Sequence, residues 1–203
     1  GLLMPYGIII PQGINQYRKK IIQILENANA VLSVVAIREF RFMHDEFIHL
    51  DQQLAILEQE ILGLAKTRKD CQKLMTIPGV GPLVATAVVA WLGDCSQFNN
   101  ARECSAYLGI VPRQHSSGNM TRLGGISKRG NRYLRQLLVL GAKTDLYAAK
   151  ARQSKLRILA RDEWSTAIEL RRHANVAAVA LANKNARIIY ALLRDNSEYR
   201  VAA

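Results

Sequence analysis

The stretch Cys71–Phe98, CQKLMTIPGVGPLVATAVVAWLGDCSQF, carries the strongest fold signal in the sequence. Apolar residues run on both sides of Ile77–Gly81, and the proline and glycines there favour a tight turn between two helices. The turn has the pattern hxGhG, where h is an apolar residue, which is typical of a helix-hairpin-helix. The sequence therefore predicts two helices that meet at this turn.

The same turn is a candidate phosphate-binding element. Its glycines leave amide N–H groups uncapped at the start of the second helix, where the helix dipole favours an anion. Gly79, Val80 and Gly81 are therefore candidate contacts with a nucleic-acid backbone, which position a protein without reading base sequence. The alternative is a plain corner between two helices, whose glycines only relieve crowding.

Helical periodicity also dominates the chain before this stretch. From Ala36 onward apolar residues recur at three- and four-residue steps, which is the seam of a heptad repeat: Phe40, Met43, Phe47, Leu50, Leu54, Leu57, Ile61 and Leu64. A helix over residues 31–66 is ~50 Å long and needs a partner along its length. Two partners fit: a helix over 14–29 in an antiparallel hairpin, or a second copy in a coiled coil.

The remaining periodicity predicts an all-α fold. We expect a short helix at Ala101–Leu108, another at about Asn131–Lys150, and a C-terminal helix pair interrupted near His173–Asn175. A short strand is expected at Tyr6–Ile10. The fold class is thus a long coiled-coil helix followed by a helical domain that contains the helix-hairpin-helix.

Composition points to a polyanionic partner. The chain has 28 Lys and Arg against 16 Asp and Glu, a net charge of +12, and 49% hydrophobic residues, enough for a folded core. Nucleic acid is the commonest partner for such a surplus, and a merely soluble basic protein is the alternative. The three cysteines lack CxxC spacing, which predicts neither a disulfide nor a zinc site and suits a reducing cytoplasm. We see no signal peptide and no apolar run long enough to span a bilayer, so no membrane partner is expected.

The segment at residues 113–135, RQHSSGNMTRLGGISKRGNRYLR, is too basic and too rich in glycine for a core helix, and we expect a loop. Its serines Ser116 and Ser117 either donate to a phosphate or, once deprotonated, attack phosphorus. His115 is either a base or solvent-exposed. No cluster of acidic residues indicates a metal site. The candidate phosphate contacts in and after this segment are Arg113, Arg122, Lys128, Arg129, Arg132, Arg135 and Lys143.

Taken together, these motifs resemble one family. Residues 74–144, with YGIIIPQG at 6–13 and NVAAVALANKNARIIYALL at 175–193, resemble the C-terminal part of the DEDD-type insertion-sequence transposases. This group includes the pilin-gene invertase and the bridge-RNA-guided recombinases. The resemblance covers practically the whole chain.

The resemblance implies an organisation and a set of roles. Residues 1–13 correspond to the tail of a RuvC-like domain, 14–70 to a helical hairpin or coiled coil, and 71–203 to a helical serine transposase domain. In the family a serine forms a covalent link to DNA, which maps onto Ser117, directly before Gly118, with Ser116 in reserve. Family members form dimers or tetramers, here through the helix at 36–64, and some bind a structured guide RNA.

The resemblance also sets an expectation for the chain alone. The DEDD carboxylates and their Mg²⁺ belong to the RuvC-like domain, most of which this sequence lacks. We therefore expect a chain that binds DNA but neither cuts nor joins it alone, in a bacterial cytoplasm and associated with the nucleoid. The alternative function is a non-catalytic helix-hairpin-helix module whose serines contact phosphates.

Overall fold

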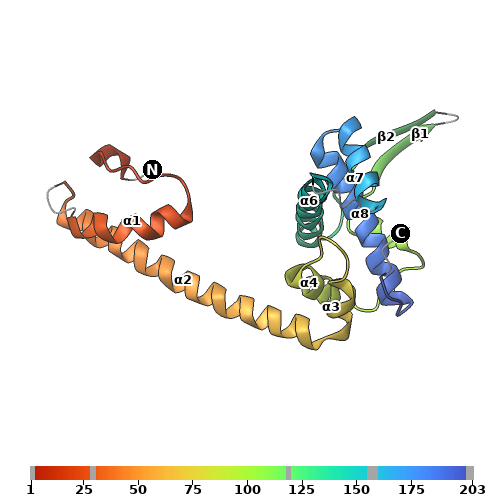
Figure 1. Ribbon diagram of the computed structural model, residues 1–203, viewed down its shortest axis with the longest axis horizontal. Helices are drawn as coiled ribbons and strands as arrows, with labels where there is room; N and C mark the ends of the chain where they lie inside the picture. The colour runs from red at the N-terminus through yellow and green to blue at the C-terminus, as the bar shows by residue number, and fades with distance from the viewer. Residues whose placement is uncertain (1–2, 28–30, 118–119, 155–159, 200–203) are drawn as a thin grey trace. The chain divides into compact units, whose positions relative to one another are not determined.

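The computed structural model describes residues 3–27, 31–117, 120–154 and 160–199, and within it the chain forms two compact units, Gly1–Gln59 and Glu60–Ala203. The described part is mainly helical, with a two-stranded sheet in the second unit (Figure 1). The all-α prediction is confirmed for the bulk of the fold.

The first unit is built on two helices, α1 (Ile14–Asn27) and the first part of α2 (Val34–Thr67). The Tyr17 ring meets the Phe47 ring edge-on at 5.2 Å, and Arg18 forms an ion pair with Asp51. Helix α1 is therefore a partner of α2, as the hairpin alternative predicts. However, its 14 residues span ~21 Å against ~51 Å for the 34 residues of α2, so most of the longer helix is left without it.

The strand expected at Tyr6–Ile10 is wrong. A short 3₁₀ helix, η1 (Met4–Tyr6), stands at its beginning, and the rest has no regular structure. Ile8 and Ile10 pack against the small core of this unit, while Ile9 is 72% exposed. The apolar residues of this segment thus pack on one side, and the described residues of this unit offer no second strand to pair with it.

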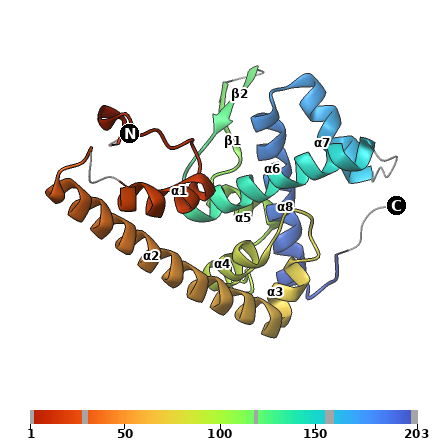
Figure 2. The same ribbon diagram turned by 60° about the vertical axis from the view of Figure 1, so that its left-hand side comes forward.

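The second unit is a helical bundle that also carries a two-stranded β-hairpin. Helix α8 lies among the others and packs on α3, α5, α6 and α7 (Figure 2). Its alanine-rich faces are fully buried, which permits close helix approach. The elements of this unit are α3 (Lys69–Leu74), α4 (Pro82–Leu92), α5 (Ala101–Tyr107), β1 (Pro112–Ser117), β2 (Met120–Ile126), α6 (Arg132–Ser154), α7 (Ala160–Arg171) and α8 (Ala174–Arg194).

Helix α8 also corrects one expectation. Within the described residues it is long and apolar enough, by composition, to cross a membrane, although no apolar run of that kind was expected. The model instead buries its residues Leu181, Ala182, Ile189 and Leu192 in the core of the unit. Its apolar character is therefore explained by packing against the neighbouring helices.

The predicted turn between α3 and α4 is present and packs tightly on α6. Gly79 has φ +82°, which favours glycine, and a Cβ built on Gly141 of α6 would lie 2.0 Å from the Gly79 carbonyl oxygen. Asn185 of α8 donates to the carbonyl oxygen of Pro78 at 3.4 Å. The turn is thus fixed from two sides by helices that are distant in sequence.

All three cysteines are free and buried, so no disulfide joins them. Cys95 and Cys104 lie together in the core. The pKa of the Cys104 thiol is raised well above its usual range, mainly by the hydrogen bond with Cys95 and also by burial. These thiols are consequently packing residues of the second unit.

Candidate nucleic-acid interface

The segment expected to be a loop is a β-hairpin, which corrects that prediction. Strands β1 and β2 pair antiparallel, with an irregularity between Pro112 and Gln114. The hairpin projects from the helices of its unit (Figure 1, Figure 2). Side chains on both of its faces are exposed, so the sequence lacks the alternation of apolar and polar residues that marks a half-buried strand.

Pairing in the hairpin assigns Ser117 to one face. Ser117 lies opposite Met120, and His115 lies opposite Arg122. Because side chains alternate along a strand, these four residues share one face of the hairpin. Together with Ser116 they line a hollow of about 410 Å³. The model therefore places the predicted nucleophile beside a guanidinium and an imidazole.

By its register Ser116 belongs to the opposite face, although it also lines the hollow, and it is differently engaged. It lies opposite Thr121, and Gln114 is paired with Leu123 on the same face. The Gln114 Nε2 donates a hydrogen bond to the Ser116 Oγ at 2.8 Å. The two serine candidates are thus distinguished by position and by partner. Gly118, which the resemblance uses to choose between them, lies outside the described residues.

The base of the hairpin is fixed by backbone contacts. The Lys128 N–H donates to the Gly109 carbonyl at 3.0 Å, and Arg135 Nη1 donates to the carbonyls of Leu108 and Arg129 at 3.2 and 3.1 Å. A Cβ on Gly109 would lie 2.0 Å from the Arg129 carbonyl oxygen. Arg135 therefore uses its guanidinium to hold the segment that follows β2.

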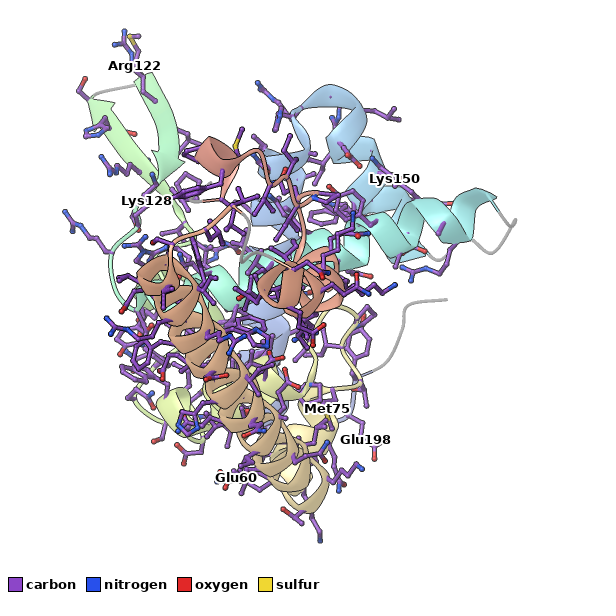
Figure 3. All side chains as sticks on the ribbon, turned by 90° about the vertical axis from the view of Figure 1, so that its left-hand side faces the viewer. Glu60, Met75, Arg122, Lys128, Lys150 and Glu198 are labelled. Carbon is purple, nitrogen blue, oxygen red and sulfur yellow. The ribbon has the colours of Figure 1, made fainter. Side chains whose placement is uncertain are left out.

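The other predicted basic contacts are on the surface of this unit. Arg113, Arg122, Lys128, Arg129 and Arg132 are exposed, and Lys143 is half-buried on α6. Figure 3 shows Arg122 near the free end of the hairpin and Lys128 near its base. The described part of the chain contains no ion pair to any of them. Their charge is thus available to an external anion.

The glycine turn offers fewer backbone N–H groups to a phosphate than its sequence indicates. The Val80 N–H already donates to the Ile77 carbonyl at 3.0 Å, and the Val80 side chain is buried. Gly79 packs against Gly141, as described above. Gly81 is exposed and precedes Pro82 at the start of α4. Of the three residues predicted to contact phosphate, Gly81 is the one that is exposed and lies directly before a helix. Its contact with phosphate stays a prediction.

Two residues beside the candidate site, Gln114 and Ser127, were not among the candidates predicted from the sequence. Gln114, which engages Ser116, and Ser127, which follows β2, gain their positions from strand pairing. The Gly118-Asn119 pair, a dipeptide typical of two-residue hairpin turns, is the sequence signal that indicated such pairing. Ser127 had no signal, because its surroundings come from β1 and α5.

Among the residues that the structure describes, no group of three or more His, Cys, Asp or Glu side chains could hold a metal ion. The Mg²⁺ implied by the resemblance is assigned to the RuvC-like domain and not to these side chains.

Comparison with known proteins agrees with these features. Residues 71–157, which run from within α3 through the whole of α6, match the transposase IS116/IS110/IS902 family. The chain is 41% identical over 203 residues to the transposase for insertion sequence element IS1111A of Coxiella burnetii, covering 100% of this chain and 54% of that protein. The chain thus carries the IS116/IS110/IS902 transposase family domain at residues 71–157.

Other relatives are also proteins of insertion elements. The transposase for insertion sequence element IS1328 of Yersinia enterocolitica is 34% identical over 197 residues, covering 97% of this chain and 57% of that protein. An uncharacterized 43.6 kDa protein of insertion element IS110 from Streptomyces coelicolor is 28% identical over 149 residues, or 73% of this chain and 35% of that protein. The chain spans about half the length of the Coxiella and Yersinia transposases.

Proposed function

We propose that this chain is the DNA-binding part of an insertion-sequence transposase and that its hairpin presents Ser117 to a DNA phosphodiester. The observation that carries the proposal is the strand register, which groups Ser117 with His115 and Arg122 and leaves Ser116 with Gln114 on the other face. The family match supports the reaction class, and the net charge of +12 supports the partner.

The proposed reaction is a phosphoryl transfer to the serine. A bond forms between Ser117 Oγ and phosphorus, the bond from phosphorus to one neighbouring nucleotide oxygen breaks, and that oxygen leaves as a hydroxyl after protonation. The Arg122 guanidinium stabilises the charge that develops on the phosphate oxygens. Attack by a DNA hydroxyl on the serine-linked phosphate reverses these bonds and joins a strand.

His115 is the nearby candidate for the serine proton. The Cα atoms of His115 and Ser117 are ~6.6 Å apart along the strand, and in this proposal one water molecule passes the proton between the two side chains. The carboxylates and Mg²⁺ that the resemblance implies come, in this proposal, from protein outside residues 1–203. A structured guide RNA is a further proposed partner in the bacterial cytoplasm.

A second copy of the chain is the proposed partner of α2. Leu50, Leu54 and Leu57 of the heptad seam are between 50% and 56% exposed, although α1 packs on the preceding part of the helix. Leucines at alternating three- and four-residue steps are the seam of a coiled coil. A dimer or tetramer through α2 buries this seam.

The test is covalent capture of DNA by the longest natural form of the protein that contains residues 1–203. Wild-type protein is incubated with DNA that carries an insertion-sequence end. The mixture is then denatured and separated by gel electrophoresis, which reveals any covalent protein–DNA adduct. We expect Ser117→Ala to abolish the adduct and the matched variant Ser116→Ala to keep it, because the first removes the attacking oxygen. An undiminished adduct with Ser117→Ala would refute the assignment.

Absence of an adduct with the wild-type protein has a different meaning. It would favour the alternative of a non-catalytic nucleic-acid-binding module, in which both serines only contact phosphates. Binding measured in the same samples separates the two cases, because the module still retards the DNA under native conditions.

A further inference from the structure

A second pocket lies at the base of the hairpin and shares His115 with the hollow around Ser117. Its volume is about 640 Å³. Strand β1, the end of α5 and the segment after β2 each contribute to its wall. The lining residues are Ala106, Val111, Arg113, Gln114, His115, Ser127 and Arg129.

Ser127 has a hydroxyl that the described structure leaves unsatisfied. Its Oγ is buried and has no hydrogen-bond partner, while its backbone N–H donates to the Val111 carbonyl at 2.9 Å and fixes the residue in the pocket wall. Buried polar atoms without partners are rare in folded proteins, because an unmade hydrogen bond is costly. To bind a ligand in the adjoining pocket, this hydroxyl must turn into it by rotation about χ1 between staggered positions.

The charge of the pocket selects an anion. Arg113 and Arg129 stand in its lining, no acidic residue does, and within the described ranges neither arginine has an ion pair. The Arg135 guanidinium holds the Arg129 carbonyl, so the wall is anchored before any ligand binds. Two guanidinium groups and a hydroxyl donor match the geometry of phosphate oxygens.

We propose that this pocket binds one backbone phosphate of DNA without covalent chemistry. Arg113 and Ser117 are four residues apart on β1, or ~13 Å at 3.3 Å per residue, so this phosphate is a different one from the phosphate that Ser117 attacks. The pocket thereby sets the position of the strand along the hairpin. The inference rests on the proposed function of DNA binding, and it is independent of the Ser117 reaction.

The test measures reversible binding of the chain to a duplex by fluorescence anisotropy at several salt concentrations. We expect Ser127→Ala to weaken binding roughly ten-fold, the effect of losing one hydrogen bond to a charged group, without lowering the melting temperature. Arg129→Gln is expected to reduce the steepness of the log–log salt dependence by about 0.9, the contribution of one phosphate. Ser96→Ala and Arg68→Gln, at exposed positions outside the pocket, are the matched controls and should bind as wild type.

Two results would overturn the pocket. Wild-type affinity and salt dependence in both Ser127→Ala and Arg129→Gln would show that no phosphate binds there. A weaker complex of Ser127→Ala that goes with a lower melting temperature would show a structural role instead.

The outcomes for the pocket and for Ser117 are separable. Ser117→Ala in the same binding assay keeps the dependence on Ser127 if the pocket is correct, whatever the adduct experiment gives. Conversely, an adduct that depends on Ser117, together with binding that ignores Ser127, refutes the pocket and leaves the proposed function standing. A chain that fails to bind DNA at any salt concentration refutes both.

Discussion

At the residue scale, Gly141 determines how closely α6 approaches the turn between α3 and α4. The backbone of Gly79 lies where a side chain on Gly141 would stand, with 2.0 Å between a built Cβ and the Gly79 carbonyl oxygen. Real Cβ atoms do not approach oxygen so closely, so any larger residue there must push the turn away from the helix. Through this contact a single glycine in α6 positions the turn between α3 and α4.

Replacement of Gly141 by alanine is therefore expected to destabilise the protein by about 1–3 kcal/mol, as overpacking does. Gly63→Ala in α2 is the matched control, because a Cβ at Gly63 meets nothing within 4 Å. That change should stabilise the helix by roughly 0.5–1 kcal/mol, since alanine replaces glycine in a helix interior. Urea unfolding of the two variants measures both effects. Equal stability of Gly141→Ala and Gly63→Ala would contradict the packing argument.

The sequence revealed only one side of this contact. Pro78, Gly79 and Gly81 are turn residues by their own conformational preferences, so the turn was predictable from local sequence. Gly141 lies inside a helical pattern. A glycine is needed there because the backbone of Gly79, more than sixty positions earlier in the chain, packs against it, and local sequence preferences do not reveal such a contact. The same limit applies to Ser127, whose environment is set by strand pairing.

At the element scale, apolar periodicity made the helices predictable. Helix α8 buries one face, so its apolar residues recur at helical spacing, and α2 carries a heptad repeat although its leucines are exposed. The hairpin buries neither face, so its sequence contains no apolar repeat, and its signal is the turn dipeptide Gly118-Asn119. The error at Tyr6–Ile10 has the opposite cause, since the apolar residues there belong to a segment packed on one side without a pairing strand.

Helix α2 carries the element-scale prediction. Leu50→Lys with Leu57→Lys is expected to convert an oligomer of the chain to a monomer, because the charges cannot be buried in a coiled-coil seam. Gln52→Lys adds a charge to an exposed position away from the seam and should leave the oligomer unchanged. Sedimentation velocity gives the mass of each species. A monomeric wild-type chain, or an oligomer that survives the double change, would contradict a second copy on α2.

At the scale of the whole molecule, function depends on groups from different elements meeting at one exposed structure. The +12 charge and the family match indicate DNA, yet neither tells one serine from the other. That distinction comes from the hairpin register, which groups Ser117 with Arg122 and sets the second pocket at the hairpin base. The sequence and its resemblance thus named the candidate residues, and the fold places them around two hollows, which are the anion sites of our proposals.

The most direct measurement locates the DNA on the protein. After covalent capture, digestion of the DNA and cleavage after Arg113 and Arg122 release the peptide QHSSGNMTR, residues 114–122, which contains both serine candidates. Fragmentation of this peptide by mass spectrometry assigns the nucleotide remnant to one side chain. The account predicts that the remnant is on Ser117. A remnant on Ser116 or Thr121, or on a residue outside this peptide, would contradict it.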